Sequence, residues 1–186
     1  MKGSKIWLIT GNLHKVKEAR AVLSEYDIQL EQYPTERIEI QSDDPAKIAE
    51  YSLNQIPDDG RPMLIEDAGL FIDHYGGFPG PYSSYALEKL DNPGILNLMS
   101  SIQDRDAEYQ SAIAFRFNGK ILYFKGIVRG KISKKIRGTG GFGYDPIFIP
   151  EEGDGRTFGE MSDEEKNMIS HRARALSELG IWLSQL

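Results

Sequence analysis

Two adjacent acids, Glu66 and Asp67, follow an apolar run in the stretch LIEDAGL and could bind a metal ion or activate water. The run predicts a strand that ends in these acids, and the carboxyl ends of strands in open α/β sheets are the usual place for a ligand. Adjacent carboxylates suit Mg²⁺, which takes oxygen ligands, or one could act as a general base. Glu39, in RIEIQ, could complete a metal site. The alternatives are that the pair only caps the next turn and that Glu39 is a surface acid.

The stretch TGNLHK, residues 10–15, lies where a predicted strand meets a predicted helix. Backbone N–H groups and the helix dipole favour anions at such a helix start, and Lys15 adds positive charge one turn in. The spacing differs from that of a Walker P-loop. An ordinary capped helix with a solvated lysine fits the same residues.

A glycine-rich stretch, GTGGFGYDPIFIPEE, occupies residues 138–152. Glycine is costly in ordered backbone, so this density indicates a tight turn or close approach by a ligand. The last of these glycines runs directly into Tyr144, Asp145 and Pro146.

One cation falls on the apolar face of the C-terminal helix. That face consists of Ile169, Leu176, Leu179 and Leu183, and Arg172 lies within it. A buried guanidinium needs a partner, either in an internal salt bridge or, together with His171, as donors into a pocket. Lys166 lies well off this face, so it can serve the same site only if the helix breaks near Ser170.

The remaining patterns predict the elements that must position these residues. Asn12 caps the first helix, Asn118-Gly119 marks a hairpin, and Ser162 with Glu165 forms a capping box for a long C-terminal helix. These elements predict an α/β fold, a mixed β-sheet flanked by helices with two lobes around a cleft. Strands are expected at 5–10, 28–33, 62–73 and on both arms of 107–133, and helices at 12–26, 43–56, 79–90, 92–102 and from 162 onward.

The composition excludes several classes of protein. The net charge is −6 with no basic run, which argues against a nucleic-acid binder. Cysteine is absent, so disulfides, thiolate metal sites and cysteine nucleophiles are excluded. No apolar run is long enough for a signal peptide or a membrane span. We therefore expect a soluble cytoplasmic protein without a membrane partner.

Taken together, the motifs resemble the inosine triphosphate pyrophosphatase (Ham1-like) family over essentially the whole chain. The stretches TGNLHKVKEA, IEDAGLFIDHYGGFPGPYS, GGFGYDPIFIPEE and TFGEMSDEEKNMISHRARAL occur in the family's order and at about its spacing. The resemblance implies a single domain over 1–186, with an elongated sheet and a central nucleotide-binding cleft. It also implies a Mg²⁺-dependent, usually homodimeric hydrolase of non-standard purine nucleoside triphosphates (ITP, dITP, XTP). Such enzymes cut between the α and β phosphates and release the monophosphate and pyrophosphate.

The resemblance also implies roles for individual residues. Glu39 and Asp67 would hold the metal, and Asp67 would be the general base. His171 and Arg172 are plausible donors to the 6-oxo group of the base, so ATP, with an amino group there, would leave them unpaired. An aromatic side chain beside the glycines could stack on the base. The implied substrate contacts are Thr10, Gly11, Asn12, Leu13, His14 and Lys15 for the phosphates, Phe142, Gly143, Tyr144 and Asp145 for the base and sugar, and Ala68, Lys166, His171 and Arg172 to complete the site.

Two positions depart from the family's pattern, and both remove positive charge. Ser84 stands where a lysine or arginine is common, and the helix after Glu39 has Tyr51, Ser52 and Leu53 in a region where a lysine often faces the substrate. Lys47 or Lys89 could compensate. Two other functions stay open: a related Maf-like enzyme that cleaves the same bond in nucleotides of another base, and a nucleotide-binding protein without turnover.

Overall fold

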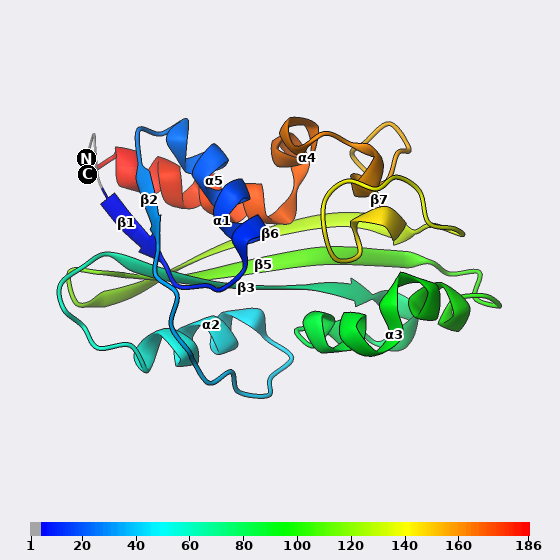
Figure 1. The fold of residues 1–186 in the computed structure, drawn as a ribbon, viewed down its shortest axis with the longest axis horizontal. Helices are drawn as coiled ribbons and strands as arrows, with labels where there is room; N and C mark the ends of the chain where they lie inside the picture. Colours follow the sequence, from blue (N-terminus) through cyan, green and yellow to red (C-terminus); the bar gives the residue numbers. More distant parts are fainter. Residues whose placement is uncertain (1–4) are drawn as a thin grey trace. The chain divides into compact units, whose positions relative to one another are not determined.

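The computed structural model describes residues 5–186, and Figure 1 shows a mixed sheet with helices on its faces. The strand order is β2-β1-β3-β5-β6-β7, and β4 pairs with β3. The strands are β1 (Lys5–Leu8), β2 (Gln29–Gln32), β3 (Met63–Ile72), β4 (Pro79–Gly80), β5 (Asp106–Phe117), β6 (Lys120–Ile132) and β7 (Phe148–Pro150). The helices are α1 (Leu13–Ser24), α2 (Pro45–Asn54), α3 (Ser83–Leu98), α4 (Asp163–Ile169) and α5 (His171–Ser184), with short 3-10 turns at Asp73–Tyr75, Asp145–Ile147 and Phe158–Glu160.

Local signals set most of these boundaries as predicted. The Asn12 side chain caps α1, and Asp44 caps α2, which has Pro45 in its first turn. The hairpin between β5 and β6 turns at Asn118 and Gly119, both with positive φ (50° and 71°), the geometry that favours this dipeptide. The α/β class and the mixed sheet flanked by helices are confirmed.

Two details differ from the prediction. Strand β3 spans Met63–Ile72, close to the expected 62–73, so Glu66 and Asp67 lie inside a strand and not at its end. The predicted long C-terminal helix is two helices, because Ser170 has extended backbone angles (φ −70°, ψ 153°) between α4 and α5. The break expected near Ser170, if Lys166 was to serve the site, is therefore present.

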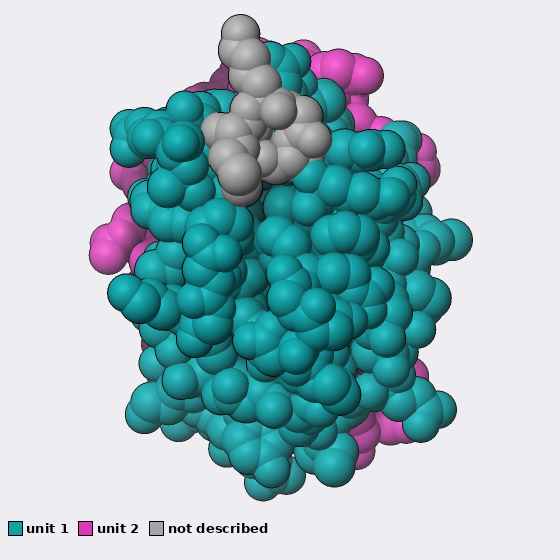
Figure 2. Space-filling model, turned by 90° about the vertical axis from the view of Figure 1, so that its left-hand side faces the viewer, with its two compact units in different colours: residues 1–67, 111–126, 171–186 teal, residues 68–110, 127–170 magenta. Residues whose placement is uncertain are grey.

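The described chain divides into two compact units, coloured separately in Figure 2. Unit 1 consists of the chain up to Asp67, Ser111–Gly126 and His171–Leu186. Unit 2 consists of Ala68–Gln110 and Ile127–Ser170. The chain passes from one unit to the other within β3, β5 and β6 and between α4 and α5.

Each unit has its own apolar core. In unit 1, α1 and α5 lie side by side on one face of the sheet and pack against Ile6, Leu8 and Phe115, and α2 covers the opposite face at Ile9 and Ile65 (Figure 1). In unit 2 the core combines α3 with β5, β6 and the 144–161 region, and its largest fully buried side chains are Phe148 and Phe158. Among the described helices, none combines the length and apolar character that crossing a membrane requires.

Candidate functional site

In unit 1, the two acids of β3 serve opposite faces of the sheet. Successive side chains of a strand point to opposite sides. Glu66 therefore shares a face with Leu64, which packs with α1 and α5, whereas Asp67 shares a face with Ile65, which packs with α2. Adjacent in sequence, the two carboxylates have separate surroundings and so separate chemistry.

Glu66 is the centre of a buried ion network. Its Oε2 lies 2.8 Å from Nζ of Lys15. Its Oε1 accepts hydrogen bonds from Oγ of Ser111 (2.7 Å) and Nε of Arg172 (3.1 Å). Burial alone would raise the pKa of Glu66, but the charges of Arg172 and Lys15 and the hydrogen bonds from Lys15 and Ser111 outweigh it and hold the pKa well below its usual range. Glu66 is therefore an ionised anchor for the two cations.

Arg172 has the partners that its buried position requires. Nη1 pairs with Oε2 of Glu18 on α1, and Nε pairs with Glu66. Glu18 and Arg172 are both more than nine-tenths buried, as is His171 beside it. Of the two alternatives for Arg172, the internal salt bridge is present.

The 10–15 stretch forms a capped helix start whose lysine is engaged. Oδ1 of Asn12 accepts the backbone N–H groups of His14 (2.9 Å) and Lys15 (3.3 Å), and Oγ1 of Thr10 accepts that of Asn12 (3.1 Å). The Leu13 side chain is exposed, and nothing in the described chain approaches within 4 Å of a Cβ built on Gly11. The Lys15 side chain is mostly buried against Glu66, so it is not a solvated surface lysine.

Asp67 has the environment of a proton-accepting or metal-binding carboxylate. Burial raises its pKa to about 7, the positive charge of Lys15 opposes this, and the negative charges of Glu66 and Glu39 add to it. Its Oδ2 is buried, and no group in the described chain hydrogen-bonds to it. Glu39 is half exposed and pairs with Nη2 of Arg37 at 2.7 Å.

The carboxylates of Asp67 and Glu39 fit a magnesium ion that takes most of its ligands from water and from the substrate. Within residues 5–186, no three His, Asp or Glu side chains converge as a ligand set. Mg²⁺ commonly uses one or two carboxylates and completes its shell with water and substrate phosphates. The unpartnered Oδ2 of Asp67 and the exposed carboxylate of Glu39 are compatible with that arrangement.

In unit 2, Lys166 and Asp145 form a second buried ion pair. Their charged atoms are 2.7 Å apart, and both side chains are almost completely buried. Oδ2 of Asp145 also accepts the backbone N–H of Phe142 at 2.7 Å. Nζ of Lys166 lies over the Phe142 ring, 4.7 Å from its centroid. Asp145 thus holds both the backbone and the cation that border the Phe142 ring.

The glycines of the 138–143 stretch have different roles. A Cβ on Gly138 would lie 2.0 Å from the backbone oxygen of Gly159, and one on Gly141 would lie 2.1 Å from Oδ2 of Asp145. These two glycines are required by packing within the protein. Gly143 also has positive φ (67°), but a Cβ there would meet nothing within 4 Å. Of these three, Gly143 alone leaves open space for a ligand.

Tyr144 is a core residue. Its ring is nearly inaccessible, and its hydroxyl donates to the backbone oxygen of Ser83 at 2.9 Å. Only its backbone could face a substrate, so Phe142, which is partly exposed, is the aromatic side chain suited to stacking on a base. Nδ2 of Asn92 donates to the backbone oxygen of Gly143 at 3.0 Å and supports the same turn. Ala68 lies inside β3 and can offer its backbone.

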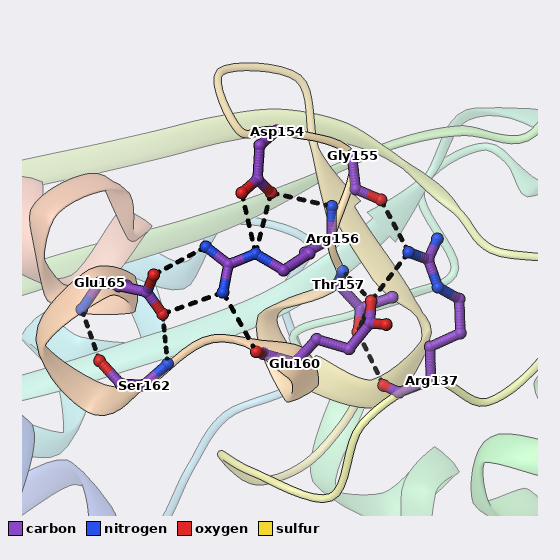
Figure 3. A network of polar contacts seen from close by, with 8 residues as sticks. All are labelled: Arg137, Asp154, Gly155, Arg156, Thr157, Glu160, Ser162 and Glu165. Atoms are coloured by element: carbon purple, nitrogen blue, oxygen red, sulfur yellow. Dashed lines mark hydrogen bonds and ion pairs between the residues drawn. The ribbon is translucent and has the colours of Figure 1, made fainter.

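A polar network fastens the segment that leads into α4 (Figure 3). The Arg156 guanidinium binds Glu165 through two parallel contacts of 2.7 and 3.1 Å and also pairs with Asp154. Arg137 binds Glu160 at 2.9 Å. Ser162 and Glu165 complete the predicted capping box. The network fixes the start of α4 and thereby the direction of Lys166.

A cavity of about 640 Å³ in unit 2 contains none of the predicted site residues. Its charged lining is mixed in sign, with Arg129, Lys131 and Arg137 beside Glu108 and Glu151. The cavity therefore gives no reason to place the functional site elsewhere than at the predicted residues.

Sequence reasoning missed three residues of these clusters. Ser111 is a small polar residue in the apolar run of β5, and Glu18 lies one turn after Lys15 on α1, so both patterns were visible as buried polar positions. Arg37 stands two residues before Glu39 and carried no recognisable signal.

The chain belongs to the Ham1 family, whose model matches residues 6–182. The dITP/XTP pyrophosphatase of Saccharolobus solfataricus is 45% identical over 184 residues, covering 98% of this chain and 95% of that protein. The dITP/XTP pyrophosphatase of Methanopyrus kandleri is 42% identical over 180 residues, covering 96% and 95%.

Solved structures agree with this assignment. A HAM1 protein from Coxiella burnetii matches with a TM-score of 0.84 and 29% identity, covering 98% of this chain and all of that one. The Ham1 protein of Staphylococcus aureus matches with a TM-score of 0.83 and 26% identity, covering 98% and 99%.

Proposed function

We propose that this chain hydrolyses the non-standard purine nucleotides ITP, dITP and XTP to the monophosphate and pyrophosphate, and so removes deaminated purines from the nucleotide pool. Relatives over 40% identical along nearly the whole chain are named dITP/XTP pyrophosphatases. The observation that carries the proposal to this chain is Asp67, a buried carboxylate with a pKa of about 7 and one oxygen that no described group occupies.

In the proposed reaction, water adds to the α-phosphorus, the bond from that phosphorus to the bridging oxygen breaks, and pyrophosphate leaves. Asp67 takes the proton of the attacking water, and in the absence of the metal ion its pKa of about 7 lies in the range that suits a general base. Lys15, held by Glu66, and the helix start at 10–15 bind the phosphates. Glu66 itself stays ionised and keeps Lys15 and Arg172 in place.

We propose Mg²⁺ as the cofactor, with Glu39 and Asp67 as its protein ligands. When bound, the ion neutralises phosphate charge and polarises the oxygen atoms at the reacting phosphorus. The small number of available carboxylates supports an ion that is bound largely through the substrate and water.

Residues of unit 2 are proposed to bind the base. Phe142 stacks on it, the open side of Gly143 allows close approach, and Lys166 lies against the Phe142 ring. His171 and Arg172, which belong to unit 1, stay the proposed donors to the 6-oxo group. A site built to donate there rejects the 6-amino group of ATP strongly, because its donors would be left unpaired.

The test is pyrophosphate release from ITP, XTP, GTP, ATP, dTTP and UTP, with Mg²⁺ and with chelator, for the wild type and Asp67→Asn. We expect selective turnover of ITP and XTP that is lost with chelator and in the variant. Turnover of pyrimidine nucleotides would instead support the Maf-like activity. ITP binding without any turnover would identify a nucleotide-binding protein.

We further propose a homodimer formed through α3 and the loop before it. Large exposed apolar side chains gather there in unit 2, namely Phe78, Tyr82, Tyr85 and Leu90. Light scattering of Phe78→Ser/Tyr85→Ser should show a monomer, and Ile181→Ser, an equally exposed apolar position on α5, should leave the dimer intact. Leu87 packs against the unit 2 core and is unsuitable for this test. An unchanged dimer in the double variant would move the interface elsewhere.

The proposal has three further parts. The chain forms a single functional domain over 1–186, it is located in the cytoplasm, and it has no nucleic-acid or membrane partner. The family match over 6–182 supports the single domain, and the acidic net charge of −6 supports the absence of a nucleic-acid partner.

A further inference from the structure

A triphosphate needs positive charge, and the cation first expected to supply it in unit 1, Lys15, is already paired with the buried carboxylate of Glu66. Ser52, in the region where a lysine was expected, is fully buried, and its hydroxyl donates to the backbone oxygen of Ile38 at 3.1 Å. Ser52 is therefore part of the protein interior and cannot contact a ligand.

The suggested substitutes are poorly placed. Lys47 lies on the exposed side of α2, whose buried residues include its neighbours Ala46 and Ile48. Lys89, in unit 2, is half exposed and pairs with Glu88. Within residues 5–186, neither makes a contact that directs it toward a predicted site residue.

Arg37 is a cation with a hydrogen-bond donor that is not used within the described chain. Its side chain is only 16% exposed, and its one ion pair in the described chain joins Nη2 to Oε1 of Glu39. Its Nε is buried and has no hydrogen-bond partner within residues 5–186. A guanidinium carries five N–H donors, and a buried donor without an acceptor costs free energy. Such a group is poised for an incoming acceptor.

The backbone beside Arg37 is held in place by α2. The side-chain amide of Gln55 donates to the oxygen of Ile38 at 2.7 Å and accepts its N–H at 3.1 Å, and Ser52 binds the same oxygen. The chain between Arg37 and Glu39 is therefore fixed although it belongs to no helix or strand. The charges of both residues also reach the carboxyl of Asp67.

We infer that Arg37 is a substrate-binding residue that donates to the phosphates of the nucleoside triphosphate and that, in the resting protein, occupies the carboxylate of Glu39. The inference rests on the proposed function, in which Glu39 is a metal ligand. Arg37 attracts the substrate but competes with the metal ion for Glu39. Removing the Arg37 side chain should therefore weaken binding of the nucleotide and strengthen binding of the metal ion.

The experiment compares Arg37→Gln and Arg37→Lys with the wild type and with Arg61→Gln. Arg61 is a matched control, since it is also in unit 1 and also pairs with an acid two residues away, Asp59. Binding of Mn²⁺ to the nucleotide-free protein and binding of ITP in the presence of chelator are measured by calorimetry. The KM and kcat for ITP are measured with saturating Mg²⁺, and thermal unfolding shows that each variant is folded.

For Arg37→Gln we expect ITP to bind about tenfold more weakly or worse and the KM for ITP to rise by a similar factor, because a charge-assisted hydrogen bond is lost. We expect kcat to change by less than about threefold and Mn²⁺ to bind more tightly. Arg37→Lys should recover ITP binding only in part, because lysine lacks the planar fork of donors. Arg61→Gln should match the wild type in every measurement.

Unchanged ITP binding in Arg37→Gln, or weaker binding of both ITP and Mn²⁺, would overturn the inference, the second result showing a purely structural role. A wild type that binds ITP without hydrolysing it would refute the proposed function alone. The ITP-binding comparison would still decide the role of Arg37.

Discussion

The ammonium of Lys166 lies 2.7 Å from the carboxylate of Asp145, and both side chains are almost fully excluded from solvent. One carboxylate oxygen thereby holds a cation and the backbone N–H of Phe142. The pair is an internal support for the turn that carries Gly143, and its energetics can be measured separately from catalysis.

Lys166→Met should lower the free energy of unfolding by about 3–5 kcal/mol, because it leaves Asp145 charged and buried without its cation. Asp145→Asn in the same protein should restore much of that loss. Urea unfolding of both single variants and the double variant forms a complete cycle. Activity should stay low in all three, since Lys166 is also proposed to border the base. Additive losses in the double variant would contradict a buried ion pair.

Glu66→Gln should also destabilise the protein strongly, by about 3 kcal/mol or more, because Lys15 and Arg172 both lose a buried counter-charge. Glu31→Gln is the control, since Glu31 pairs with Lys5 and Arg20 at the surface, where a pair contributes at most about 1 kcal/mol. Chemical denaturation measures both variants. Equal effects would show that the network around Glu66 contributes no more than a surface pair.

Asp67 should give the metal-free protein a distinctive pH dependence. Its pKa rises from 3.8 to about 7 on folding, so between these values the folded state binds more protons than the unfolded state. The contribution of Asp67 to stability is therefore present at low pH and lost as the pH rises from about 4 to about 7, by up to about 4 kcal/mol.

The measurement is the difference in unfolding free energy between the wild type and Asp67→Asn across that range in chelator. Comparing the two proteins cancels the other titrating groups. A difference that does not vary with pH would mean that Asp67 ionises normally in the folded protein.

Gly126→Ala should disturb the start of α5. A Cβ at this position of β6 would lie 2.0 Å from the backbone oxygen of His171 and 2.7 Å from the nitrogen of Ala175. We expect a loss of about 1–3 kcal/mol from overpacking and lower activity, because His171 and Arg172 form the first turn of that helix. Gly11→Ala, where a Cβ meets nothing within 4 Å, should change stability far less. Thermal unfolding and ITP turnover test both, and a fully active Gly126→Ala would contradict the role given to this contact.

Much of the fold was predictable because its signals are local. Asn12, Asn118-Gly119 and the Ser162–Glu165 capping box act through backbone groups a few residues away, and each forms as predicted. The buried position of Arg172 also followed from helical spacing, as did its need for a carboxylate. In these cases the physical cause lies within one or two turns of chain.

The tertiary structure decided the identities and distances of the partners. Apolar pattern predicted the extent of β3 but could not show that its second half pairs with β4 at Leu70 and Phe71, because that pairing is a contact between segments. Nor could it show that Lys15 would be bound by Glu66, 51 residues away, or that Tyr144 would lie in the core.

Arg37 shows most clearly the difference between what the sequence predicts and what the tertiary structure decides. By sequence alone it is a charged residue in an irregular segment, for which a surface position is the ordinary expectation. Gln55 and Ser52 hold the backbone of its neighbour Ile38, and its partner is the proposed metal ligand Glu39. The sequence by itself determined which chemical groups the protein has and where most of its helices and strands lie. Only the packing of distant segments decided which charges are already neutralised and which can still bind a ligand.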